Sequence, residues 1–145
     1  MSSRIDYYKT SPDVVKAMIG LENIVNKSGL ERSLLDLVKL RASQINGCAF
    51  CVDTHCADAR KNGESERRLY AVAVWRETPF FTNKERAALA WTEAVTLLTE
   101  THAPDELYQE VLKYFNEKET IDLTFAIITI NGWNRLAVSF RKLPV

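Results

Sequence analysis

The sequence predicts an all-α fold, a compact bundle of about seven helices. Apolar residues recur at helical spacing along most of the chain. Caps, prolines and glycines mark the starts and ends of these segments, and no stretch shows the strand-turn-strand pattern of a hairpin. With 145 residues, the chain has the length of one ordinary domain, and we expect short loops between the helices.

Four helices are predicted in the first half of the chain. Ser11-Pro12-Asp13 supplies a cap, a proline and an acid for the first turn of a helix that continues to about residue 28. Residues 31–46, about 48–62 and 64–77 form the next three, and the last of these closes before Thr78-Pro79. Glycines that can adopt a left-handed conformation follow the first three helices: Gly29, Gly47 and Gly63.

The second half of the chain contains three further predicted helices. Thr82 and Glu85 form a capping box for the fifth helix, which runs over about residues 83–100. Pro104 opens the sixth, which ends near Phe115. Thr120 is the predicted cap of a long, mostly apolar final helix that continues to about residue 142.

Composition and charge exclude several classes of protein. Hydrophobic residues make up 46% of the chain and charged residues 26%, as in a globular domain with a full core. Lys plus Arg and Asp plus Glu are each 19, so the net charge of zero argues against a nucleic-acid or anionic-membrane binder. The apolar runs are too short to span a bilayer. The start lacks the apolar core of a secretory signal, so we expect a cytoplasmic protein.

The three cysteines lie together in the segment "NGCAFCVDTHCADARKNG". Cys48 and Cys51 come at the start of a predicted helix, where free N–H groups and the helix dipole stabilise a thiolate. They are three residues apart and share one face, and His55 follows Cys51 by one turn on that face. This spacing supplies a nucleophile, a second thiol and a base. We expect mild oxidation to join Cys48 to Cys51 and to leave Cys56 free.

Other readings of the cysteine segment fit its residues less well. Attachment of c-type haem needs histidine directly after the second cysteine, where this chain has Val52. A zinc site could use Cys48, Cys51, His55 and Cys56, but four tetrahedral ligands rarely come from one short helix. The other histidine, His102, precedes Pro104 and is read as a solvated loop residue. Inert core packing is the usual role of a lone buried cysteine, but not of this pattern.

The stretch "DLVKLRASQINGCAFCVDTH" resembles the core motif of the AhpD-like alkylhydroperoxidases of the carboxymuconolactone decarboxylase family. The segments "RIDYYK", "AVWRETPFFTNKERAALAWTEAVTLL" and "INGWNR" also resemble one subgroup of that family. The resemblance covers nearly the whole chain, so it implies that residues 1–145 are a single AhpD-like domain. It further implies an all-α fold and a homo-oligomer, commonly a trimer or hexamer, with the cysteine helix near a subunit contact.

The resemblance also implies an activity and roles for four residues. Redox-active members of the family reduce peroxides with a Cys-x-x-Cys pair, without metal, haem or another cofactor, and a dithiol or redoxin-type donor recycles them. Carried over, Cys51 is the peroxidatic thiol, Cys48 is the resolving thiol and His55 is a proton relay. The family acid, twelve residues before the first cysteine, corresponds to Asp36.

Three positions depart from the pattern of the family or need a reading of their own. Asp36 stands where the family normally has Glu, so its reach is one methylene shorter, and the residues alone equally allow a solvated acid paired with Lys39. Phe50 stands where some members have a second histidine, so proton transfer would depend on His55. Cys56 is read as a small residue packed against the next helix, with a mixed disulfide as its functional alternative.

Polar side chains interrupt the apolar final helix in "INGWNR". Such groups need hydrogen-bond partners, either in a core or intersubunit network or, as the less favoured reading, in the active site: Asn131, Asn134 and Arg135. The tryptophans are predicted to be core or interface residues: Trp75, Trp91 and Trp133.

Two functional classes remain open from the sequence. One is a thiol peroxidase or disulfide reductase, with a peroxide and a dithiol donor as its partners. The other is a non-catalytic redox-responsive or zinc-binding interaction module. Family members without the cysteines suggest lactone decarboxylation as a third activity, but this chain carries the redox pair.

Overall fold

The computed structural model describes residues 1–145 and contains nine α-helices and one 3₁₀ helix, with no strand. The all-α prediction is therefore confirmed. The seven expected helices correspond to α2 (Pro12–Asn26), α3 (Arg32–Ile45), α4 (Ala49–Lys61), α5 (Glu66–Ala71) with η1 (Val72–Glu77), α6 (Asn83–Thr96), α8 (Asp105–Leu112) and α9 (Glu117–Phe140). The predicted count was low for two reasons. It omitted α1 (Tyr7–Thr10), which is too short to show a periodic pattern, and it joined α7 (Leu98–Thr101) to α6 in one helix over about residues 83–100.

Most of the predicted helix ends are confirmed. The three glycines that follow α2, α3 and α4 have φ values of 95°, 64° and 92°, a region that favours glycine: Gly29, Gly47 and Gly63. The capping box of Thr82 and Glu85 opens α6. The predicted cap of the final helix is wrong, because a capping box of Asn116 and Glu119 opens α9 before Thr120 is reached.

The fourth predicted helix is interrupted. Residues 66–71 are α-helical, but the chain then tightens into the 3₁₀ helix η1, in which Val74 has non-helical φ and ψ of −126° and 30°. The kink directs Trp75 into the core, where it is buried and its indole N–H donates to Glu93 (2.9 Å). Tertiary packing of this side chain therefore outweighs continuous helical hydrogen bonding.

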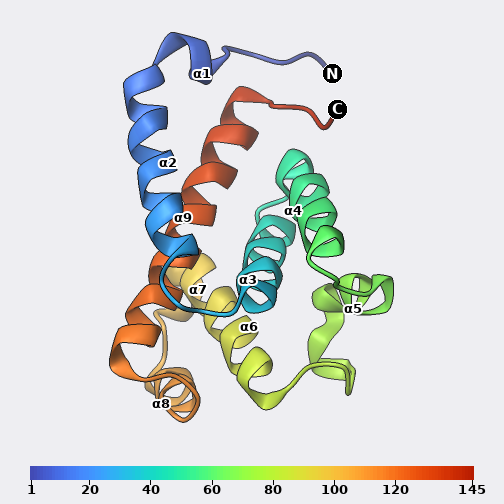
Figure 1. The fold of residues 1–145 in the computed structure, drawn as a ribbon, viewed down its shortest axis with the longest axis vertical. Helices are drawn as coiled ribbons and strands as arrows, with labels where there is room; N and C mark the ends of the chain where they lie inside the picture. The colour runs from blue at the N-terminus through green and yellow to red at the C-terminus, as the bar shows by residue number, and fades with distance from the viewer.

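Helix α3 lies at the centre of the molecule, packed against α4, α6 and α9, while α2 runs beside α9 (Figure 1). Each large aliphatic side chain buried in such a core stabilises the fold by about 1.5–3 kcal/mol. The largest core cluster joins α2, α3, α6, α8 and α9: Val25, Leu30, Leu34, Leu35, Val38, Ala88, Trp91, Val111, Phe115, Leu123, Ala126 and Ile127. A second cluster joins α3 and α4 to α5, η1 and α6.

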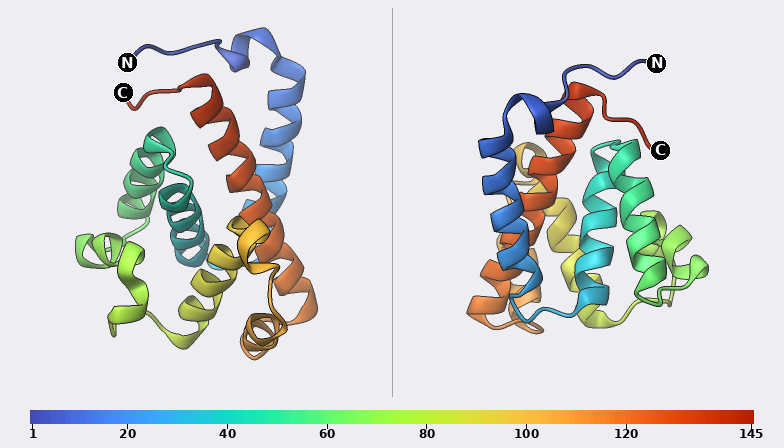
Figure 2. Two further views of the ribbon diagram at one scale, coloured as in Figure 1. Left: turned by 180° about the vertical axis from the view of Figure 1, so that it is seen from behind. Right: turned by 45° about the horizontal axis from the view of Figure 1, so that its top comes forward.

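The first and last residues of the chain lie near each other, beside the C-terminal end of α9 (Figure 2). Arg4 fixes this arrangement, because its backbone N–H donates to Phe140 O (3.0 Å) and its guanidinium donates to Ser139 O (2.9 Å). Both terminal segments therefore flank the start of α4, where Cys48 lies. None of the helices combines the length and apolar character that a membrane crossing requires.

Candidate active site

Cys48 and Cys51 form a disulfide at the start of α4, and Cys56 is free. The predicted pairing is therefore confirmed. Cys48 is the N-cap of α4, and its Sγ accepts a hydrogen bond from the Cys51 N–H (3.3 Å). The turn at Gly47 leads into it, and the Cys48 N–H donates to Ser43 O at the end of α3 (3.0 Å). Both sulfurs are thus held at the end of the helix that stabilises negative charge.

Cys51 and His55 open onto a common pocket of about 180 Å³ between α1, α2, α4 and α9. The structure therefore brings together the two residues whose one-turn spacing predicted a shared face. The other residues of the pocket are mostly aromatic or apolar, with one carboxylate: Tyr7, Tyr8, Glu22, Phe50, Thr54, Trp133 and Ala137. Such a lining suits a ligand with an apolar body beside the sulfur.

His55 is neutral at physiological pH. Its burial, followed by the positive charge of Lys39, lowers its pKa from 6.5 to about 4. A neutral imidazole beside Cys51 has a free lone pair that can accept the thiol proton. Asp58 and Glu22 act in the opposite direction and stabilise the imidazolium that such a transfer would form.

The carboxylate in this pocket is Glu22, which no sequence motif predicted. Its Oε1 accepts a hydrogen bond from the Lys39 ammonium (2.5 Å), which also donates to Asn26 Oδ1 (2.9 Å). Lys39 is only 4% exposed, so its charge needs these partners. The apolar neighbours of Lys39 in the sequence signal a buried cation, but they do not reveal which carboxylate on another helix meets it.

Asp36 does not pair with Lys39 and makes no hydrogen bond to His55. Its carboxylate accepts from the Asn62 amide (2.7 Å) and lies 3.5 Å from the Arg32 guanidinium. Burial raises the pKa of Asp36, while Asn62 and the nearby cations oppose the shift. Since Asn62 is the C-cap of α4, Asp36 connects α3 to the end of the helix that carries Cys51 and His55.

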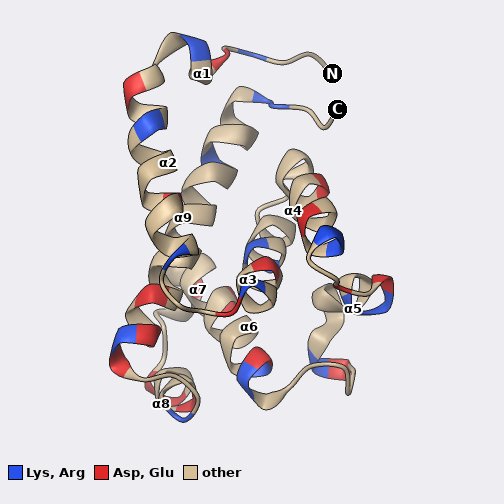
Figure 3. Cartoon of the chain, in the orientation of Figure 1, with Lys and Arg blue, Asp and Glu red and all other residues tan.

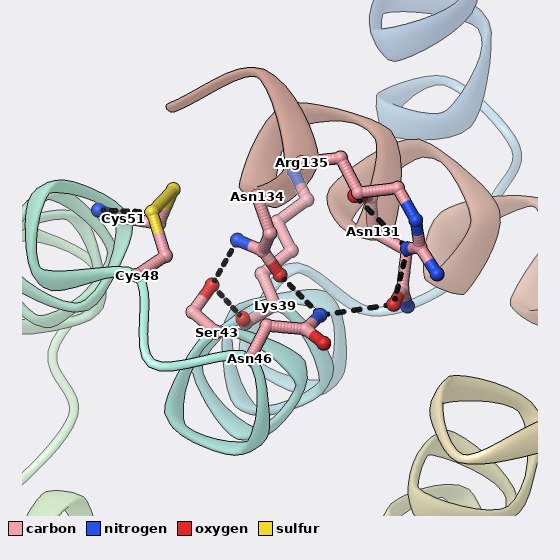
Figure 4. The surroundings of a disulfide bond; sticks show 8 residues. All are labelled: Lys39, Ser43, Asn46, Cys48, Cys51, Asn131, Asn134 and Arg135. Carbon is pink, nitrogen blue, oxygen red and sulfur yellow. Dashed lines mark hydrogen bonds between the residues drawn. A yellow bond between two sulfur atoms is a disulfide. The ribbon is translucent and has the colours of Figure 1, made fainter. Parts of the chain in front are cut away.

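The polar residues of "INGWNR" form a core network that reaches the cysteine loop (Figure 4). The Asn46 amide donates to Asn131 Oδ1 and Asn134 Oδ1, both at 2.9 Å. Asn134 donates in turn to the Ser43 hydroxyl (3.0 Å). The backbone carbonyl of Ser43 accepts a hydrogen bond from the Cys48 N–H. The predicted core network is thus confirmed within this chain, and it ties α9 to the turn that presents Cys48.

The remaining predicted positions have structural roles. Cys56 is half-buried and packs against the second core cluster, as expected, and burial raises its pKa. Trp75 and Trp91 are core residues, whereas Trp133 lines the pocket of Cys51. His102 is exposed in the turn after α7, as expected. No three His, Cys, Asp or Glu side chains lie close enough together to hold a metal ion.

Comparison with known proteins places this architecture in a family. Residues 12–94 match the model of the carboxymuconolactone decarboxylase family. The uncharacterized protein YdfG of Bacillus subtilis is 42% identical over 139 residues, which are 96% of this chain and 95% of YdfG.

A crystal structure from Agrobacterium tumefaciens, of a protein of unknown function described as a candidate antioxidant defence protein AhpD, is 49% identical. It superposes with a TM-score of 0.97 over 99% of both chains. The alkyl hydroperoxide reductase AhpD of Hyphomonas neptunium is 37% identical over 49 residues, 34% of this chain and 27% of that protein. The chain therefore belongs to the carboxymuconolactone decarboxylase family, and AhpD-like proteins are among its relatives.

Proposed function

We propose that the protein is a thiol-dependent peroxidase that uses Cys51 and Cys48 and is recycled by a dithiol donor. The observation that carries this proposal is the pocket that Cys51 shares with neutral His55. A peroxide O–O bond is attacked by a thiolate, so the nucleophilic thiol needs a base within its own pocket. The similarity to AhpD and to the Agrobacterium protein supports the same class of reaction.

The proposed cycle has three balanced steps. His55 accepts the Cys51 proton, and the thiolate attacks the distal oxygen of a hydroperoxide, which leaves an alcohol or water and a sulfenic acid on Cys51. Cys48 then attacks the Cys51 sulfur, so that water leaves and the disulfide forms. A dithiol donor supplies two electrons and two protons, becomes a disulfide itself and restores both thiols.

Two carboxylates support the cycle in different ways in this proposal. Glu22 lies in the pocket and stabilises the imidazolium of His55 after proton transfer. Asp36, the acid that the family resemblance implied, acts as a positioning residue because its hydrogen bond to Asn62 holds the end of α4. Phe50 contributes an apolar wall of the pocket rather than a second proton carrier.

The proposal is tested with peroxide consumption and sulfenate trapping. Cys51→Ser should abolish peroxide consumption, while Cys48→Ser should permit one stoichiometric oxidation, trapped as sulfenate on Cys51, without turnover. His55→Ala should lower the rate by about 10²–10⁴ if His55 is the general base. Cys56→Ser is the matched control, because Cys56 lies outside the pocket of Cys51 and should leave turnover unchanged.

Three outcomes would contradict the proposal. Sulfenate on Cys48 of the Cys51→Ser variant at the wild-type rate would reverse the assignment of the two thiols. Loss of two thiols to one equivalent of peroxide, without turnover by any dithiol donor, would instead indicate a redox-responsive module. Stoichiometric zinc in a metal assay of the reduced protein would indicate a zinc-binding module.

A further inference from the structure

The two sulfurs of the disulfide open onto different pockets. Cys51 lines the pocket of His55 and Glu22, and Cys48 does not. Cys48 lines a second pocket of about 350 Å³, between the start of α4, the end of α9 and the two terminal segments, and Cys51 does not reach it. A reagent that enters the second pocket therefore meets Cys48 first.

All charged side chains that line this second pocket are cationic: Arg4, Arg141 and Lys142. None of them forms an ion pair with a carboxylate of the chain, although the protein contains ten such pairs elsewhere. Because the chain as a whole has no net charge, this pocket is a local concentration of positive charge. Figure 3 shows the basic positions of both terminal segments at this end of the molecule.

The backbone and the aromatic rings hold these cations in place. Lys142 lies over the rings of Tyr8 and Phe50, 4.0 and 4.6 Å from their centres. The backbone N–H of Lys142 donates to Ala137 O (2.9 Å) in the turn that ends α9. Arg4 is fixed from the other end of the chain by its two hydrogen bonds to α9.

A simpler explanation accounts for only part of the cluster. Cations near the C-terminal end of a helix offset its dipole, which suffices for Arg141 and Lys142 at the end of α9. Arg4 comes from an extended N-terminal segment, and its guanidinium donates to Ser139 O at the same end of α9. The dipole amounts to only about half an elementary charge, however, which three cations exceed. Three cations from two distant segments around one reducible sulfur indicate recognition of an anionic partner.

We propose that the pocket of Cys48, Arg4, Arg141 and Lys142 is the docking site of the electron donor, a dithiol protein with carboxylates around its reactive thiols. This inference rests on the proposed function, because it assigns the donor of that cycle to one face. The peroxide and the donor then reach the disulfide through different pockets. The two half-reactions do not compete for one pocket.

The docking site fixes the order of bond exchange. A donor thiolate attacks Cys48 Sγ, a mixed disulfide forms between the donor and Cys48, and Cys51 leaves as a thiolate. The second donor thiol then attacks the donor sulfur of this bond, which releases Cys48 and oxidises the donor to its disulfide. The donor loses two electrons and two protons, and the protein gains both.

The test uses small monothiols of different charge on the oxidised full-length protein, without peroxide. The reagents are anionic 2-mercaptoethanesulfonate, neutral 2-mercaptoethanol and cationic cysteamine. For each, the rate of disulfide reduction is expressed per concentration of thiolate and divided by the rate of the same thiol with an uncharged reference disulfide. At low salt we expect the anionic thiol to react about 10-fold faster than the cationic one, and the difference to fall at high salt. Quenching with an alkylating reagent and peptide mapping should find the thiol adduct on Cys48 and the alkyl group on Cys51.

Charge reversal at the pocket provides the matched variants. Arg4→Glu and Lys142→Glu should each reduce or invert the preference for the anionic thiol, whereas Lys27→Glu should not, because Lys27 is exposed at the far end of α2. Wild-type salt dependence still tests the proposal if a variant does not fold. Equal rates for the three thiols at low salt, or an adduct on Cys51, would overturn it. If the charge preference is observed but the protein does not turn over peroxide, the proposed function is refuted and the docking site is not.

Discussion

His55 combines burial with a position beside the reactive thiol, and the two together give it a measurable signature. Its folded-state pKa of about 4 lies below the value of 6.5 in the unfolded chain. The unfolded chain therefore binds a proton first as the pH falls. The contribution of this residue to stability is fully present above about pH 6.5 and is lost as the pH falls toward 4.

We predict that His55→Gln removes this part of the acid sensitivity. The free energy of unfolding of the oxidised wild type should fall by about 1–3 kcal/mol between pH 7 and pH 4 because of His55, and the variant should lack that component. Denaturant unfolding at several pH values measures the difference. His102→Gln is the control, since that side chain is exposed. Parallel curves for wild type and His55→Gln would contradict the assignment.

The Lys39–Glu22 pair makes a second prediction at the residue scale. Glu22→Gln leaves the buried Lys39 charge without its carboxylate, so we expect a loss of about 3 kcal/mol in the free energy of unfolding. Replacing both partners, as in Glu22→Gln with Lys39→Met, should restore most of the stability but not the rate of peroxide consumption. An equal loss in the single and double variants would show that the ion pair does not account for the cost.

At the scale of elements, the turn between α3 and α4 depends on α9. The chain passes from Asn46 through Gly47 to Cys48 with the side chains of Asn46 and Ser43 bonded to Asn134. The geometry of the cysteine pair is therefore set by a helix almost ninety residues later in the sequence. The net contribution of such a buried hydrogen bond to stability is small. Removing one partner is nevertheless costly, because the other partner stays buried without a hydrogen bond to protein or water.

We predict that Asn134→Ala loosens the cysteine turn. The variant should lose about 1–3 kcal/mol of stability, and hydrogen exchange of the Cys48 amide should become faster than that loss explains. Thr124→Val is the matched control, because it breaks a hydrogen bond between α9 and the Trp91 indole away from the disulfide. If both variants accelerate exchange at Cys48 equally, the network does not position the turn.

At the scale of the whole molecule, α9 leaves an apolar stripe uncovered. Its residues are spaced by four and three positions and are 58%, 44% and 46% exposed: Ile121, Phe125 and Ile128. Side chains at this spacing share one face of a helix, and an exposed apolar stripe of this kind is typical of a contact between subunits. The expected homo-oligomer would bury this face.

We therefore predict a particle mass that is a multiple of 16.5 kDa, the mass of one chain, at micromolar concentration. Phe125→Glu should shift the population toward the monomer, whereas Val74→Glu, at another exposed apolar position on η1, should not. Light scattering measures both. A wild-type mass of 16.5 kDa would rule the assembly out.

Local patterns were sufficient to predict most of the fold. Periodicity located the longer helices, and glycines with positive φ ended three of them as expected. Local patterns did not predict the cap at Asn116, where Thr120 offered a competing cap four residues later. They did not predict the kink at Val74 because it depends on where Trp75 packs.

The site was predictable only where its parts lie on one helix. Cys48, Cys51 and His55 share α4, so their spacing in the sequence determined their relation in space. Glu22, Asn46 and Asn134 lie on other elements, and their contacts depend on how α2, α3 and α9 pack. For Asp36, the spacing along α3 showed that Lys39 lies one turn away, but not that the carboxylate would instead accept from Asn62.

The hydrogen bonds of the amide network do not depend on pH. The groups that hold the cysteine turn are carboxamides and a hydroxyl, none of which gains or loses a proton between about pH 4 and pH 10. A change of pH within this range therefore does not break the hydrogen bonds that hold the turn. The pH profile of the reaction should consequently contain no contribution from loosening of this turn.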